Sequence, residues 1–230
     1  MVLQTDAEKR FPRAHRWIEF FVFFQARRRI AREHAVLQIV RNSAFDEVKN
    51  QMERAQDVGF TAFGNVQNVS LYLLLLDQDL QDYVLQLSKA VGHRQRIFAA
   101  RGLAVLLYEA AEDIPELFGR HYRTLLKEYS VSDEIMALLN NGVGNLNAFK
   151  KQNADALKRI RSYVGAHRDK DAAKQIEVLS AIDPFAVFKM APELTQGLKV
   201  LIEAQTQITA HFGQLFRRTA SFIESTIGRE

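Results

Sequence analysis

The sequence predicts an all-α protein, folded as a bundle of about seven to nine helices. Its 230 residues include only 4 prolines and 11 glycines, which favours long helices over a sheet with many turns. Apolar residues recur about every three or four positions through most of the chain, as on one face of an amphipathic helix. No alternating run of β-branched residues is long enough to predict a strand.

The first helix is expected at about residues 12–40, with Pro12 in its opening turn. Aromatic residues, including Phe20 and Phe24, make this helix apolar nearly all round, so we expect it to be buried or to contact a protein partner. An arginine cluster at residues 27–29 follows. Aromatic residues beside arginines can bind nucleic acid or a membrane surface, and the alternative is a core helix with a solvated basic end.

A second, short helix is expected to be capped by Ser43 and to end at Gly59. Residues 60–63 follow as a turn or linker between two glycines. We therefore place a boundary here, between an N-terminal helical region at residues 1–62 and a helical bundle at residues 63–230. One continuous domain is the alternative.

In the middle of the chain, we expect helices at about residues 65–91, 96–112 and 115–129. Gly92 separates the first two of these helices, and Pro115 is expected to begin the third.

Three aspartates, Asp77, Asp79 and Asp82, lie close together on the helix expected at 65–91. Such a group can suggest a metal site, but the glycine and the later glutamate of an EF-hand loop are absent. We interpret the three as a solvated acidic face and expect no metal site in this protein.

The central helix is expected from Ser132 to Asp171, because acidic residues in its first turn suit the positive end of the helix dipole. Its apolar residues fall on one stripe at helical spacing. Asn153 lies on that stripe, and a buried amide needs partners, so we expect it to hydrogen-bond to another helix or to water. Gly142 and Gly144 predict the close approach of another helix.

Two further helices complete the prediction, at about residues 169–182 and in the last part of the chain up to about Ile227. Turns are expected at 183–184 and at 191–192, because each dipeptide ends in proline. The last helix is long enough to pack at the edge of a bundle or against a second copy.

Candidate catalytic residues occur late in the central helix, at Arg161 and His167. A neutral histidine can accept a proton from a ribose 2′-hydroxyl, and an arginine can stabilise charge on a phosphate. On a straight helix the two diverge by about 120°, so they meet only if Gly165 lets the helix bend or a second chain completes the site. The alternative is a half-buried histidine with one hydrogen bond, beside a solvated arginine.

Candidate nucleic-acid-binding residues form a basic line with Arg161 along the same helix: Lys150, Lys158 and Arg168. The net charge of +4 is compatible with an anionic partner without requiring one.

The spacing of Arg161 and His167, and the wording Ala-His-Arg-Asp at residues 166–169, resemble the signature of the HEPN superfamily. That signature is an arginine and a histidine separated by about four to six residues in a helical chain. The resemblance implies a HEPN-like helical core within residues 95–190 and a homodimer with two Arg–His pairs across a cleft. Members are ribonucleases of bacterial defence or toxin–antitoxin systems, or inactive binding domains. The family favours a polar Asn, Asp or His after the arginine, where this chain has Ser162.

The composition excludes several kinds of chemistry. The chain contains no cysteine, so it has no disulfide, no thiolate metal ligand and no cysteine nucleophile. No signal peptide, transmembrane segment, phosphate-binding glycine loop or di-iron motif is evident. We expect a cytoplasmic protein without a cofactor.

Two function classes follow. The first is a HEPN-like RNA-binding protein or metal-independent ribonuclease with RNA as its partner. The second is a non-catalytic interaction or scaffold protein of the same fold, with a protein partner on the Phe-rich N-terminal helix. A membrane-surface role for residues 20–32 is a third hypothesis.

Overall fold

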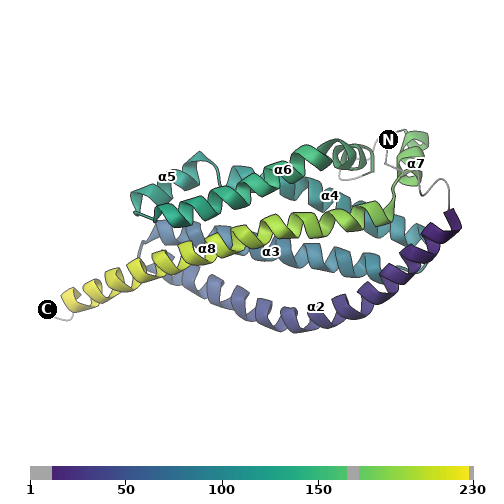
Figure 1. Cartoon of the computed structure of the whole chain (residues 1–230). Helices are drawn as coiled ribbons and strands as arrows, with labels where there is room; N and C mark the ends of the chain where they lie inside the picture. The colour runs from purple at the N-terminus through teal and green to yellow at the C-terminus, as the bar shows by residue number, and fades with distance from the viewer. Residues whose placement is uncertain (1–11, 165–170, 228–230) are drawn as a thin grey trace. The chain divides into compact units, whose positions relative to one another are not determined.

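The computed structural model of the chain describes residues 12–164 and 171–227, and within them the side chains of residues 29–32, 34–163 and 171–219. These residues contain seven α-helices and no strand, which confirms the all-α prediction (Figure 1). The helices are α2 (Pro12–Asp57), α3 (Thr61–Lys89), α4 (His93–Leu117), α5 (Arg120–Glu128), α6 (Asp133–Val164), α7 (Ala172–Ser180) and α8 (Pro184–Ile227).

Glycines end the first two of these helices, as the sequence predicts. Gly59 follows α2 with a φ of +71°, and Gly92 precedes α4 with a φ of +96°. Only glycine adopts such angles without steric cost, so the chain can reverse direction at both places. The expected linker at residues 60–63 is wrong beyond Phe60, because α3 begins at Thr61.

Three expected helix breaks are wrong. α2 continues through Ser43, since no glycine or proline interrupts it between Pro12 and Asp57. Pro115 lies inside α4 and Pro192 lies inside α8. Although proline lacks an N–H and disfavours helix interiors, buried neighbours on both sides of each proline outweigh this local preference. They are Ala111, Ile114 and Phe118 around the first, and Val187, Ala191 and Leu194 around the second.

Asp171 is also placed differently from the prediction. Instead of ending the central helix, it caps α7, where its Oδ1 accepts hydrogen bonds from the backbone N–H groups of Ala173 at 2.9 Å and Lys174 at 3.1 Å. An aspartate in this position satisfies two of the free N–H groups of a helix start. The expected turn at Asp183 is confirmed, because α8 begins at Pro184.

The chain divides into two compact units. The first combines the described chain up to Gln38 with Asp77–Asp113 and Asn147–Thr195. Leucines from α3, α4, α6 and α8 fill its core, and each fully buried leucine stabilises the fold by about 1.5–3 kcal/mol. These leucines, each at most 1% exposed, are Leu80, Leu87, Leu103, Leu107, Leu157 and Leu194.

The second unit combines Ile39–Leu76, Ile114–Leu146 and the chain from Gln196 onward. Its core includes Phe63, Phe118 and Phe212, each at most 1% exposed. Gly142 allows α6 to approach α8 closely, since a Cβ there would lie 2.6 Å from Cδ2 of Leu201. A Cβ at Gly144 would have no neighbour within 4 Å, so the predicted close approach is confirmed at Gly142 only.

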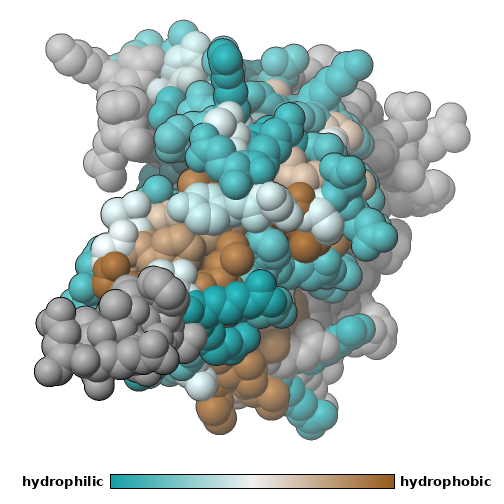
Figure 2. Space-filling view, turned by 90° about the vertical axis from the view of Figure 1, so that its left-hand side faces the viewer, coloured by the Kyte–Doolittle hydropathy of each residue, from teal (hydrophilic) through white to brown (hydrophobic). Residues whose placement is uncertain are grey.

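An aromatic cluster lies at the start of α3 in the second unit. The ring of Phe60 is 5.8 Å from that of Tyr129, 6.4 Å from that of Phe212 and 6.3 Å from that of Phe216. Phe60, Tyr129 and Phe216 are only partly buried. Figure 2 shows one face on which hydrophobic residues lie among hydrophilic ones.

Candidate functional site

The candidate site belongs to the first unit and is built on the last turns of α6. Phe149, Leu157 and Ile160 of this helix are each at most 5% exposed, which confirms the predicted apolar stripe. Arg161 follows Ile160 and therefore lies at the edge of the stripe, with 36% of its side chain exposed. This position gives the guanidinium contact with both protein and solvent.

Two consecutive residues of α4 hold Arg161 in place. The Nε atom lies 3.8 Å from Oε1 of Glu109, and the guanidinium carbon lies 5.5 Å from the centre of the Tyr108 ring. The first distance is an ion pair but too long for a hydrogen bond. The Nε atom is buried and has no hydrogen-bond partner among the described residues. A carboxylate and an aromatic face thus restrain the guanidinium together.

A second ion pair joins the same two helices. Nζ of Lys150 donates to Oε2 of Glu112 at 2.6 Å, and both side chains are 37% exposed. Glu109 and Glu112 are three residues apart and therefore share one face of α4. Of the three described members of the basic line, Lys150 and Arg161 thus face a carboxylate. Lys158 is exposed and has no ion pair with a described side chain.

The remaining predicted residues, His167 and Arg168, lie outside the described residues, and so does Gly165. The meeting of Arg161 with His167 therefore stays a prediction. The side chains of Phe20 and Phe24, which carry the expected partner surface, also lie outside the described residues.

Asn153 is buried as predicted, with 8% exposure. Nδ2 donates to the backbone carbonyl of Phe149 in the same helix at 3.1 Å, so the expected bond to another helix is not found among the described residues. An amide side chain can reach the carbonyl of the residue four positions earlier, and the expected bond to water stays a prediction.

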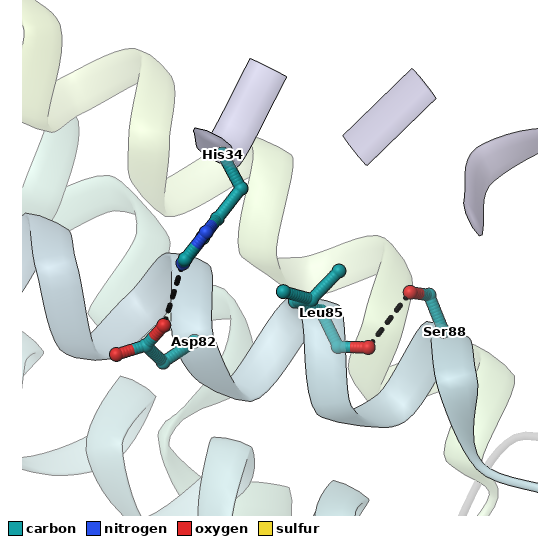
Figure 3. Close-up of polar contacts among 4 residues, drawn as sticks. All are labelled: His34, Asp82, Leu85 and Ser88. Carbon is teal, nitrogen blue, oxygen red and sulfur yellow. Dashed lines mark hydrogen bonds and ion pairs between the residues drawn. The ribbon is translucent and has the colours of Figure 1, made fainter. Parts of the chain in front are cut away.

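A histidine–carboxylate pair in the first unit was missed by the sequence analysis. Nε2 of His34 in α2 lies 2.6 Å from Oδ1 of Asp82 in α3, and Figure 3 shows the two side chains pointing toward each other. Asp82 is 41% exposed, as expected of a solvated face, but its pairing with a histidine of α2 is not part of that expectation. Neither residue has an unusual neighbour in the sequence, and only the packing of α2 on α3 brings them together.

The pKa of Asp79, about one turn before Asp82 in α3, is also affected by its neighbours. The side chain of Asp79 is exposed, but partial loss of water around its carboxyl raises its pKa above the ordinary value, and the nearby charge of Asp82 raises it further. Both effects disfavour the ionised form. In α3, Asp82 is therefore paired with a histidine, whereas the ionised form of Asp79 is disfavoured.

Arg161, Tyr108 and Glu109 together give a fixed, partly exposed cation whose remaining N–H groups can bind an anion such as a phosphate. The described residues contain no group of three or more His, Cys, Asp or Glu side chains able to hold a metal ion. None of the described helices has both the length and the apolar content needed to span a membrane. Comparisons with protein-family models, with curated proteins and with solved structures find no match to this chain.

Proposed function

We propose that this protein binds RNA and cleaves it without a metal ion, as its HEPN resemblance implies. The observation that carries the proposal is the restraint of Arg161 by Tyr108 and Glu109 at the end of α6, a short distance along the chain before His167. A restrained guanidinium loses little freedom when a phosphate binds, which makes the binding stronger. The proposal includes a HEPN-like core within residues 95–190 and a homodimer.

In this proposal each residue has one role. The imidazole of His167 takes the proton from a ribose 2′-hydroxyl, and the resulting oxygen attacks the adjacent phosphorus. The bond from this phosphorus to the 5′-oxygen of the next nucleotide breaks, which leaves a 2′,3′-cyclic phosphate, and the departing 5′-oxygen takes a proton from water. Arg161 donates hydrogen bonds from its terminal nitrogens to the phosphate oxygens, whose negative charge grows during the attack. Lys150, Lys158 and Arg168 bind neighbouring phosphates of the RNA. No cofactor takes part.

Substitution of Arg161 tests this role directly. We expect Arg161→Ala to slow cleavage of single-stranded RNA in the presence of EDTA by about a hundredfold, because one charge-stabilising group is lost. Arg159→Ala is the matched control. Arg159 lies on the same helix and pairs with Glu177 at 3.1 Å, so its loss removes an equal charge without touching the proposed site. Equal rates for the two variants would remove Arg161 from the mechanism.

A second candidate function is a non-catalytic interaction or scaffold protein. The observation that favours it is the pairing of Arg161 with Glu109 and of Lys150 with Glu112. These carboxylates reduce the positive potential that RNA requires, and they link α4 to α6 as structural pairs do. In that case the wild-type protein does not cleave RNA, and its association with a protein partner is lost when Phe20 and Phe24 are replaced by serine.

A further inference from the structure

The turn between α3 and α4 carries a surface hollow of about 460 Å³ in the first unit. Gln86 and Lys89 line it from the end of α3, and Arg94, Gln95 and Phe98 line it from the first turns of α4. Its volume lies within the range of about 300–1,000 Å³ that is typical of small-molecule sites. The hollow lies on a different stretch of the chain from the proposed catalytic residues.

The hollow is positively charged. The sequence has no acidic residue between Asp82 and Glu109, and this interval contains four lysines and arginines. Lys89 and Arg94 are exposed and form no ion pair with a described side chain. Arg94 also lies in the first turn of α4, which contains no acidic residue and where the helix dipole makes positive charge unfavourable. A bound anion would relieve this repulsion.

An exposed aromatic ring completes the hollow. Phe98 is 65% exposed, and the guanidinium carbon of Arg101 lies 4.9 Å from the centre of its ring. Exposing a large apolar ring to water is unfavourable, and stacking it on a flat partner is favourable. The arginine covers one part of the ring and adds a positive charge beside it.

A polar side chain of the same hollow, Gln95, is held by a hydrogen bond. Oε1 of Gln95 accepts a hydrogen bond from the backbone N–H of Val91 at 2.9 Å. This bond leaves the amide N–H groups of Gln95 available to donate to an anion or to a base edge.

We propose that this hollow, lined by Lys89, Arg94 and Phe98, binds one nucleotide of a single-stranded RNA outside the catalytic site. The phosphate lies between Lys89 and Arg94, and the base stacks on Phe98. A double-stranded RNA does not fit this chemistry, because its bases are already stacked on each other and cannot reach the ring. The inference rests on the proposed function, since it names RNA as the ligand.

The test measures the affinity of the full-length protein for a fluorescent single-stranded oligouridine by anisotropy. Phe98→Ala should weaken binding about tenfold, because one base–ring stack is lost. Lys89→Ala combined with Arg94→Ala should reduce the slope of log affinity against log salt concentration by about 1.4, which corresponds to two phosphate contacts. All three side chains are exposed, so these variants should keep the wild-type circular dichroism.

Matched controls separate the hollow from a general charge effect. Ile176→Ala removes another large hydrophobic side chain, 64% exposed, from the same unit. Arg120→Ala with Lys127→Ala removes an equal charge from α5, where both side chains are exposed. Both controls should bind as the wild type does, and Phe98→Ala should leave the weak binding of a duplex of matched length unchanged.

Each outcome has one meaning. If the hollow variants bind the oligouridine as tightly as the wild type, the inference is overturned while RNA cleavage at Arg161 and His167 stands. If the hollow variants bind more weakly than the wild type and the wild type does not cleave, the hollow is supported and the nuclease proposal fails. If the wild type binds no RNA, both are wrong.

Discussion

The imidazole of His34 in α2 lies 2.6 Å from the carboxylate of Asp82 in α3, and this contact joins the first two described helices within one unit (Figure 3). His34 is only 14% exposed, whereas Asp82 is 41% exposed. The histidine is therefore the partner that loses water on folding, and it depends on Asp82 for its hydrogen bond.

Replacing Asp82 with asparagine should lower the free energy of unfolding by about 1 kcal/mol, since solvent screens part of the interaction. Urea denaturation at neutral pH measures this loss. Asp155→Asn is the control, because Asp155 is exposed and belongs to the same unit. An equal effect of both substitutions would contradict a stabilising role for the pair.

Asp79 gives a pH-dependent prediction. Although the side chain is exposed, partial loss of water raises its pKa first and the charge of Asp82 raises it second, so the folded state binds its proton more tightly than the unfolded state does. The ionised form therefore destabilises the fold at neutral pH, and this cost disappears as the pH falls below the ordinary pKa of an aspartate.

Accordingly, Asp79→Asn should raise the midpoint of thermal unfolding at neutral pH and have little effect in acid. Differential scanning calorimetry across this pH range measures the difference. A stabilisation that stays constant with pH would show that the carboxylate charge is not its cause.

Two glycines of α6 predict opposite effects of the same substitution. A Cβ at Gly142 would lie 2.6 Å from Cδ2 and 3.1 Å from the backbone nitrogen of Leu201, a residue with 0% exposure. We expect Gly142→Ala to destabilise the protein by about 1–3 kcal/mol, because the packed neighbours must move. Gly144 has open space, so Gly144→Ala should stabilise the helix by about 0.5–1 kcal/mol. Chemical denaturation that ranks the two variants in the reverse order would contradict this packing.

A buried polar network in the second unit makes a further stability prediction. The hydroxyl of Tyr122 donates to Oε1 of Gln205 at 2.8 Å, and Nε2 of Gln205 donates to the carbonyl of Val66 at 2.9 Å and to Oγ of Ser70 at 3.0 Å. Replacing Gln205 with leucine removes all three bonds and leaves the buried hydroxyl of Tyr122 without this partner, whereas Ser70 keeps its bonds with the Val66 carbonyl and with Thr209. The expected loss is about 2–3 kcal/mol, against about 1 kcal/mol for Tyr122→Phe.

The same tyrosine gives an alkaline signature. Burial raises the pKa of Tyr122 above its ordinary value of 10.0, although the hydrogen bond with Gln205 lowers it in part. Ionisation therefore favours the unfolded state, and stability is lost as the pH rises above that ordinary value. Tyr122→Phe should lose less stability over this alkaline range than the wild type in urea titrations. Identical alkaline profiles would mean that Tyr122 is not buried as described.

Local signals in the sequence predict the fold class, the apolar stripe of α6 and the two glycine turns. These features depend on periodicity and on positive φ angles, which neighbouring residues largely determine. Local signals wrongly predict helix breaks at Pro115 and Pro192. Their helices continue because the residues on both sides of each proline are buried in the core, and the extent of this burial is not visible in a local sequence.

The candidate site, too, is predicted only in part by local sequence. The position of Arg161 at the edge of a buried stripe follows from helical spacing alone. Its contacts with Tyr108 and Glu109 require the register of α4 against α6, and the pairing of His34 with Asp82 requires that of α2 against α3. Such registers are set by the packing of whole helices, so no single motif predicts them.

The most direct test of RNA cleavage without a metal ion is the initial rate on single-stranded RNA in EDTA for the wild type, His167→Ala and His121→Ala. His121 is exposed in α5 and serves as the matched histidine control. We expect His167→Ala to lose at least about a hundredfold in rate while keeping the wild-type circular dichroism, and His121→Ala to lose nothing. Wild-type activity in His167→Ala, or no cleavage by the wild-type protein, would contradict the proposal.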